Sequence, residues 1–190
     1  MLDVVPISRC LGARKGMRRG VPAAAWYARG CALEATDPAA ALAAYARALA
    51  GRPDLADAWN NAGRLHHDAG ELVVAESCYR LAICAAPGVA LYWFNLGVVM
   101  EDAGRWSEAV LAYARAVDLD DACADAHFNL ARLCEQLARS GVGDVDRHSA
   151  LPDGSAALPG EACELARRAL RHYVRYRQLV GRRRHQPIFK

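Results

Sequence analysis

Apolar and polar residues along this chain recur with a period of 34 residues, and within each period the apolar positions follow the 3.6-residue spacing of amphipathic helices. Four repeats are numbered from Pro22, Ala56, Ala90 and Ala124, so that every residue has a column within its repeat. Three columns keep one residue type: Ala41, Ala75 and Ala109 in column 20, Tyr45, Tyr79 and Tyr113 in column 24, and Ala48, Ala82 and Ala116 in column 27. Each period predicts two packed helices, with small residues where their backbones approach closely.

Signals at the ends of the predicted helices agree with this. Asp37 followed by Pro38 is typical of a helix N-cap and the first helical position. Gly70 and Gly104 stand where a first helix must end in a left-handed residue. Because one helical hairpin cannot bury its own apolar face, we expect the repeats to stack into one continuous core.

The repeats resemble the tetratricopeptide (TPR) family, whose pattern is W-x2-L-G-x2-Y, then A-x3-F, then P, at a 34-residue period. The third repeat matches it best, with Trp93, Leu96, Gly97, Ala109, Tyr113 and Ala116. Column 4 reads Ala25, Trp59, Trp93 and His127, and column 8 reads Arg29, Gly63, Gly97 and Ala131. The resemblance covers residues 22–138 and, more weakly, 161–180. It implies an all-α fold, a right-handed α–α superhelix of about four helix-turn-helix repeats.

The repeat pattern also predicts the organisation of the chain. Residues 1–21 are a basic N-terminal segment for which disorder is one interpretation, and residues 22–138 hold repeats 1 to 3 and the first helix of repeat 4. Residues 139–160, rich in Gly, Ser, Asp and Pro, predict a flexible insertion at the tip of the last hairpin. Residues 161–180 predict a final helix that caps the array, and residues 181–190 a basic tail. The apolar stripe of that helix is Ala162, Leu165, Ala166, Ala169, Tyr173, Tyr176 and Val180.

Charge is unevenly spread behind a net value of +3. Residues 1–21 carry five basic and one acidic residue, residues 22–160 ten basic and eighteen acidic, and residues 161–190 nine basic and two acidic. A basic terminus can bind nucleic acid, so a nucleic-acid-associated adaptor is one alternative. However, the densest cluster, Arg182 to His185, has no interleaved aromatic residues for base stacking. A solvated tail is therefore the favoured interpretation, and nucleic acid is not an expected partner.

Several features indicate a cytoplasmic protein. The chain has no apolar run of 18 or more residues, so we expect no membrane span. At the N-terminus the basic residues follow the short apolar stretch, which is the wrong order for a secretory signal. The seven cysteines are odd in number and lack C-x-x-C spacing, so we expect small buried hydrophobes in a reducing cell, with Cys134 at a packing column. No metal or cofactor is predicted.

Column 6 reads Tyr27, Asn61, Asn95 and Asn129. In the TPR family, columns 2, 5, 6, 9, 12 and 13 face the concave groove that the first helices line. A primary amide both donates and accepts, so it can pair with the backbone of an extended peptide. Related TPR superhelices use such an asparagine ladder to hold peptides, and the resemblance carries this role over to Asn61, Asn95 and Asn129. The alternative is that these amides bond only to neighbouring turns.

The resemblance therefore implies a non-catalytic scaffold whose groove binds a protein or peptide of unknown identity, and we expect no membrane partner. One TPR subclass clamps C-terminal carboxylates with lysine or arginine at columns 5 and 2 of successive repeats. In this chain those columns hold Trp26 and Leu91 instead, so the clamp is incomplete. We expect no binding to chaperone C-terminal tails. A homodimer through the final helix is an alternative assembly. The residues expected to line the groove are Trp26, Asn60, Asn61, Arg64, His67, Phe94, Asn95, Val98, Asp102, Phe128, Asn129 and Arg132.

Catalysis is the competing class of function. His66, His67 and Asp68 are adjacent, but His66 falls at core column 11, and no nucleophile stands beside the other two by spacing. The sequence has no Gly-rich phosphate loop and no H-E-x-x-H motif. Satisfied or solvated histidines are therefore the favoured interpretation, and we expect no enzymatic activity.

A second resemblance concerns context. The segment from Trp26 to Leu137, together with Ala169-Leu170-Arg171-His172-Tyr173, is similar to the TPR arrays of bacterial proteins in which the array follows a MerR-type helix-turn-helix. Only 21 residues precede the array here, too few for that DNA-binding domain. This resemblance implies a stand-alone or truncated relative of a transcription regulator, with a regulatory or sensor role as the alternative function.

Overall fold

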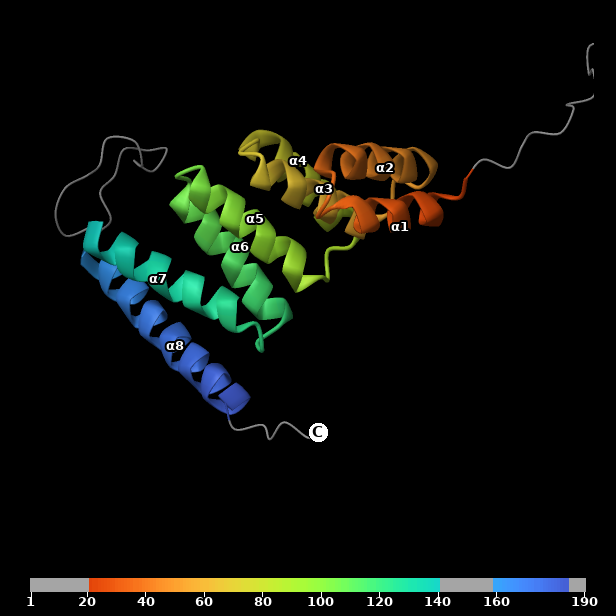
Figure 1. The fold of residues 1–190 in the computed structure, drawn as a ribbon. Coiled ribbons are helices and arrows are strands. Elements are labelled where there is room, and N and C mark those ends of the chain that lie inside the picture. Colours follow the sequence, from red (N-terminus) through yellow and green to blue (C-terminus); the bar gives the residue numbers. More distant parts are fainter. Residues whose placement is uncertain (1–20, 141–158, 185–190) are drawn as a thin grey trace, which may run out of the picture. The chain divides into compact units, whose positions relative to one another are not determined.

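A computed structural model of the chain describes residues 21–140 and 159–184, which hold eight helices (Figure 1). Their bounds are α1 Ala23–Leu33, α2 Pro38–Gly51, α3 Ala56–Asp68, α4 Leu72–Ala85, α5 Ala90–Asp102, α6 Trp106–Leu119, α7 Ala124–Ser140 and α8 Pro159–Arg184. They pair as hairpins, α1 with α2, α3 with α4, α5 with α6 and α7 with α8. The predicted all-α helix-turn-helix arrangement is confirmed for these residues.

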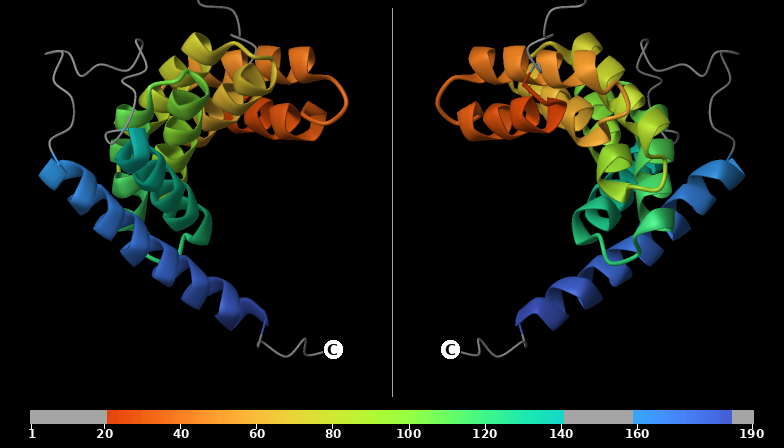
Figure 2. Two further views of the ribbon diagram at one scale, coloured as in Figure 1. Left: turned by 90° about the vertical axis from the view of Figure 1, so that its left-hand side faces the viewer. Right: turned by 90° about the vertical axis from the view of Figure 1, so that its right-hand side faces the viewer.

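Two compact parts make up the described chain: the first hairpin, and the three hairpins from Pro53 onward. Within the second part, each second helix packs against the first helix of the next hairpin, α4 against α5 and α6 against α7. Successive hairpins in this part therefore share one core. α7 and α8 lie antiparallel along each other at its end (Figure 2).

The repeated columns of the second helices form the core, as predicted. The alanines of columns 20 and 27 are completely buried: Ala41, Ala75, Ala109, Ala48, Ala82 and Ala116. The tyrosines of column 24, Tyr45, Tyr79 and Tyr113, are at most 2% exposed. Burial raises the pKa of Tyr79 to about 12, and it also raises that of Tyr113.

The predicted helix ends are also confirmed. The Asp37 carboxylate accepts a hydrogen bond of 3.0 Å from the Ala40 backbone N–H, and Pro38 begins α2. Gly70 and Gly104 have φ angles of 77° and 74°, in the left-handed region that favours glycine. After Gly104, the N–H of Arg105 bonds to the Met100 carbonyl at 2.8 Å, which closes a Schellman motif.

The predicted register of α1 is wrong by one residue. A β-carbon on Gly30 would lie 2.5 Å from the Tyr45 ring, just as Gly97 lies against Tyr113, so Gly30 and not Arg29 occupies column 8. The physical reason is that the segment from the glycine to the buried tyrosine is one residue shorter in the first hairpin: Tyr45 follows Gly30 by 15 residues, whereas Tyr113 follows Gly97 by 16. Trp26 therefore moves from groove column 5 to packing column 4. Its ring lies 4.6 Å from the Arg47 guanidinium of α2.

The residue in column 4 of each later repeat bonds to the chain that precedes it. Trp59 Nε1 donates to the Pro53 carbonyl at 2.9 Å, and Trp93 Nε1 donates to the Pro87 carbonyl at 3.0 Å. In the last repeat, His127 Nε2 lies 3.1 Å from the Asp121 carbonyl. The acceptor is six residues before the ring in all three cases, so histidine replaces tryptophan without loss of the contact.

The last hairpin differs from the prediction in its helix bounds and in the packed face of α8. α7 continues to Ser140, and α8 runs from Pro159 to Arg184 instead of over 161–180. Ala169 of the predicted stripe is buried, but Ala166 and Tyr173 are exposed. His172 takes their place on the packed side, where its Nδ1 lies 2.9 Å from Nδ1 of His127 in α7.

The cysteines divide by position. Cys78 and Cys134 are buried, as expected, and burial raises the pKa of both thiols. Cys31 and Cys84 are exposed and Cys123 is intermediate, so the expectation of burial is wrong for Cys31 and Cys84. Cys10 lies outside the described residues.

Residues 1–20, 141–158 and 185–190 lie outside the described residues, so the expectations for the basic N-terminal segment, the insertion and the end of the basic tail stay predictions. Within residues 21–140 and 159–184, no helix combines the length and apolar content needed to cross a membrane.

Candidate functional site

The first helices α3, α5 and α7 are joined by side-chain contacts between successive hairpins. We call the surface of these three helices that carries Asn61, Asn95 and Asn129 the first-helix face. Three contacts link α3 to α5, and one links α5 to α7. All four join residues that lie about one repeat apart in sequence, so the 34-residue period brings the predicted groove columns together.

A chain of amide groups lies at the centre of this face. Asn60 is buried, at 6% exposure, and its Oδ1 accepts a hydrogen bond of 2.8 Å from Asn95 Nδ2. Asn60 Nδ2 in turn donates to Asn61 Oδ1 at 3.2 Å. Asn61 and Asn95 are partly exposed, and so is Asn129 of α7. Asn60, expected to line the groove, therefore offers little surface to a ligand, and instead it orients Asn61 and Asn95.

Charged side chains form a second set of contacts across the face. His67 Nε2 of α3 lies 2.6 Å from Asp102 Oδ2 of α5. Glu101 of α5 pairs with Arg132 of α7 and also accepts a hydrogen bond of 3.2 Å from the Tyr113 hydroxyl. The sequence placed all of these except Tyr113 at groove columns, and the structure brings them together as pairs.

Apolar side chains lie beside these pairs. Phe94 is partly buried, with its ring 5.6 Å from the Tyr113 ring, and Val98 is also partly buried. Phe128 is 41% exposed, and its ring lies 5.2 Å from Tyr176 of α8. Phe128 is therefore the most accessible apolar side chain among the predicted groove residues that the structure places on this face.

The remaining predicted residues are Arg64 and Trp26. Arg64 Nη1 lies 3.5 Å from Asp68 Oδ2, one turn along α3. Trp26 belongs to the first hairpin, in the other compact part, and its corrected register makes it a packing residue.

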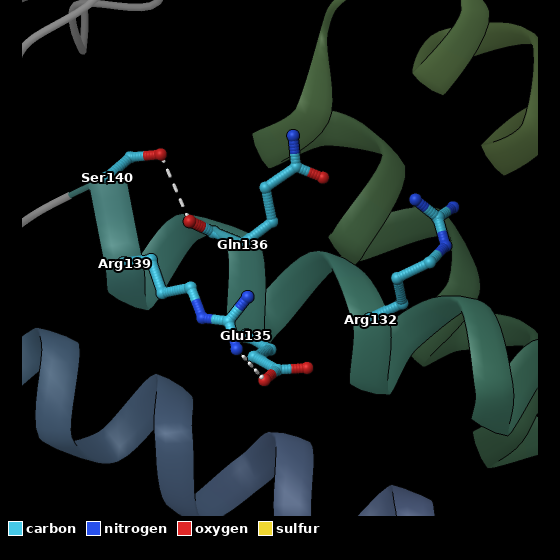
Figure 3. Close-up of a pocket in the computed structure, with 5 residues that line it drawn as sticks. All are labelled: Arg132, Glu135, Gln136, Arg139 and Ser140. Atoms are coloured by element: carbon cyan, nitrogen blue, oxygen red, sulfur yellow. Dashed lines mark hydrogen bonds and ion pairs between the residues drawn. The ribbon is translucent and has the colours of Figure 1, made fainter.

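An open pocket adjoins the C-terminal half of α7 (Figure 3). It is lined by Arg132, Glu135, Gln136, Arg139 and Ser140. Arg139 Nη2 bonds to Glu135 Oε1 at 2.7 Å, and the Arg132 guanidinium points away from both (Figure 3). Only Arg132 was among the predicted site residues. The others continue its helical spacing toward the end of α7, which is the signal that could have found them.

The histidines considered for catalysis both have carboxylate partners. His66 is partly exposed and not in the core as expected, because its Nδ1 reaches out to Glu71 Oε2 at 2.5 Å. His67 is held by Asp102, as described above. Within the described residues, no cluster of three or more His, Cys, Asp or Glu side chains is arranged to hold a metal ion.

Comparisons with known proteins agree with the repeat pattern. Two tetratricopeptide repeat family models match the chain, one over residues 32–90 and one over 90–123. No protein with a curated function matches its sequence.

Among solved structures, MamA from Desulfovibrio magneticus RS-1 is 19% identical with a TM-score of 0.62, and the match covers 87% of this chain and 77% of that one. Another crystal structure of MamA is 16% identical with a TM-score of 0.61, covering 82% and 81%. The first TPR of Spaghetti (RPAP3), bound to the HSP90 peptide SRMEEVD, is 19% identical with a TM-score of 0.59, covering 61% and 93%. At these identities the similarity is one of fold.

The 34-residue columns, the helical hairpins of the described residues and the two family matches agree with one another. The chain is therefore a tetratricopeptide repeat protein.

Proposed function

We propose that this chain is a non-catalytic cytoplasmic scaffold whose first-helix face binds an extended segment of another protein. TPR domains are, in general, modules for protein–protein interaction. The observation that supports the proposal most directly is the set of three asparagines at the same column of three adjoining helices, all partly exposed. Their regular spacing suits a ligand whose own backbone groups recur regularly.

The amide contacts leave room for a ligand. A primary amide can donate two hydrogen bonds and accept two, and Asn95 uses one N–H toward Asn60. Asn95 therefore keeps a donor and its carbonyl oxygen for a peptide backbone. Because Asn60 holds Asn95 from a buried position, the orientation of that amide is set before any ligand arrives.

Neighbouring side chains would provide selectivity. The exposed ring of Phe128 suits an apolar anchor, and the predicted groove columns carry Arg64 and Arg132 as well as Asp102 and Glu101. This mixture suits a segment with an apolar side chain and charges of both signs. Leu91, at the clamp position of column 2, is 53% exposed and uncharged, so a terminal carboxylate is not the expected anchor.

Affinity capture from the source cell would test the proposal. Wild type is compared with the variant Asn61→Ala/Asn95→Ala/Asn129→Ala and with Leu111→Ser, which changes a residue of α6 that is 68% exposed. We expect the triple variant to lose the captured proteins and the control to keep them.

Circular dichroism and thermal unfolding separate this outcome from misfolding. If the amides serve only neighbouring turns, the triple variant unfolds more easily but captures the same proteins whenever it is folded. That result would contradict peptide binding at this face.

A further inference from the structure

One side of α8 is left uncovered. Among the described helices, α7 is the one that packs extensively along α8. On the opposite flank, Leu170, Val174 and Tyr173 are 64%, 47% and 45% exposed. Their spacing of three and four residues places them in one apolar strip along the helix. We call this strip the α8 face.

The packing of the earlier hairpins indicates which kind of element fits the α8 face. In this part of the molecule, α4 and α6 are each covered by the first helix of the next hairpin. A ring contact of 6.2 Å joins Tyr173 to Tyr176, and one of 5.2 Å joins Tyr176 to Phe128. The apolar surface therefore continues from α8 to α7, as a helix lying against both would require.

Arginines flank the strip. Arg167 and Arg171 have side chains that are 69% and 62% exposed, and Arg177 is exposed one turn further on. Glu164 is the carboxylate near the first two, at 3.9 Å from Arg167 and 3.0 Å from Arg171. Residues 165–184 contain eight arginines and no acidic residue. An occupant of this face therefore has to bring carboxylates of its own.

Contacts between the earlier hairpins already combine apolar packing with such ion pairs. Arg105 Nη1, at the start of α6, lies 2.7 Å from Glu76 Oε2 of α4, and Glu101 of α5 pairs with Arg132 of α7. An acidic helix on α8 would repeat this arrangement with the arginines on the array and the carboxylates on the incoming helix.

Charge argues against a second copy of this chain as the occupant. Two α8 helices packed face to face would bring arginine against arginine. The first helix α1, which would be the counterpart in a head-to-tail stack, carries Arg29 and no acidic residue. On these two helices the acidic residues are Glu161 and Glu164 at the start of α8, and Glu164 already pairs with Arg167 and Arg171.

We propose that the α8 face, flanked by Arg167, Arg171 and Arg177, binds an acidic amphipathic helix of another protein. This site adjoins the first-helix face at Phe128 but does not use Asn61, Asn95 or Asn129, so it does not depend on the role proposed for them.

Two synthetic helical peptides of about 18 residues, or five turns, would test this inference against the full chain. Both carry leucine along one side, and the other positions are glutamate in one peptide and lysine in the second. Binding is followed by fluorescence anisotropy. We expect the glutamate peptide to bind at least about tenfold more tightly than the lysine peptide.

The variant Leu170→Ser/Val174→Ser should weaken the glutamate peptide by at least about tenfold, whereas Leu111→Ser on α6 should not. Arg167→Gln/Arg177→Gln should weaken the same peptide and reduce the effect of salt on its binding. The triple asparagine variant should bind the glutamate peptide as tightly as wild type does. Failure of the α8 proposal can therefore be told apart from failure of peptide binding at the first-helix face.

Four results would overturn the proposal: no binding of the glutamate peptide, equal binding of both peptides, a dimer in sedimentation equilibrium that Leu170→Ser/Val174→Ser abolishes, or binding to phosphatidylserine vesicles that the same variant abolishes. The dimer would make a second copy the occupant, and the vesicle result would make it an anionic membrane. Circular dichroism checks that each variant is folded, which is expected for the α8 and α6 variants because their substituted side chains are exposed.

Discussion

Gly30 of α1 lies directly against the ring of Tyr45 in α2, so that a β-carbon at position 30 would come within 2.5 Å of the ring. The corresponding distances are 3.0 Å at Gly63 and 2.7 Å at Gly97. Tyr45 is completely buried, so its ring has no solvent to move into. The glycine of column 8 is therefore required by the close approach of the two helices.

Gly30→Ala should destabilise the first hairpin, although alanine is the better helix former by up to about 1 kcal/mol. Overpacking against a buried ring costs about 1–3 kcal/mol and outweighs that gain. Hydrogen exchange of residues 23–51 in increasing urea measures the effect. Arg29→Ala, at the neighbouring exposed position, is the control and should change stability little. Equal effects of the two substitutions would contradict the corrected register.

Gly104→Ala should cost about 1 kcal/mol, because alanine is strained at a φ of 74°. No side chain or backbone lies within 4 Å of a β-carbon built at this position, so the cost comes from the backbone alone. Gly88→Ala is the matched control, since its surroundings are equally open and its φ is not positive. Urea denaturation should show a lower midpoint for the first variant only.

Asn60→Ala should destabilise the chain by about 1–3 kcal/mol, because it removes the partner of both Asn61 and Asn95 from a buried site. Asn129→Ala, at a partly exposed position, should cost less. The comparison is made by urea denaturation at neutral pH. If the two variants unfold at the same midpoint, Asn60 does not hold the network together.

Acid should destabilise the last hairpin through His172. Burial lowers the pKa of His172 from 6.5 to about 4, and His127, Arg168 and Arg171 add to the shift, with Asp118 opposing it. The unfolded chain therefore binds a proton below pH 6.5 that the folded chain binds only near pH 4. The folded state is therefore most stable, as far as His172 is concerned, above pH 6.5, where the side chain is neutral in both states. This stability is lost as the pH falls from 6.5 toward 4.

The measurement is the urea midpoint between pH 7 and pH 4.5 for wild type and for His172→Gln, which cannot titrate. Carboxylates also titrate in this range in both proteins. The prediction therefore concerns the difference between wild type and variant in how far the urea midpoint falls. Wild type should lose more stability than the variant. Parallel curves would show that His172 does not contribute to the loss of stability in acid.

The sequence predicted the second helices more accurately than the first. Alanine and tyrosine recur there because those columns are almost completely buried, and this leaves a strong pattern. In α1 the same requirement acts on Gly30, but the segment from Gly30 to Tyr45 is one residue shorter than its counterparts, so Gly30 falls outside the predicted column. A fixed period cannot reveal such a change, whereas the pairing of a glycine with a tyrosine can.

The pairs of the first-helix face were harder to predict. Column arithmetic placed His67 and Asp102 on one surface, but it could not show that they contact each other or that Asn60 turns inward. In α8, apolar residues cover more than half of the helix circumference, so the sequence alone could not choose the packed side. In the structure, the side of α8 that packs against α7 is the one that carries His172, which contacts His127.

The hydrogen bond from each column-4 ring to the carbonyl six residues earlier also bears on how such an array can change in evolution. The spacing is the same from Pro53 to Trp59, from Pro87 to Trp93 and from Asp121 to His127. Both departures from the repeat length fall inside hairpins: one residue fewer between Gly30 and Tyr45, and an insertion between α7 and α8. Insertions and deletions are thus tolerated within hairpins, while the joints between hairpins keep a constant length.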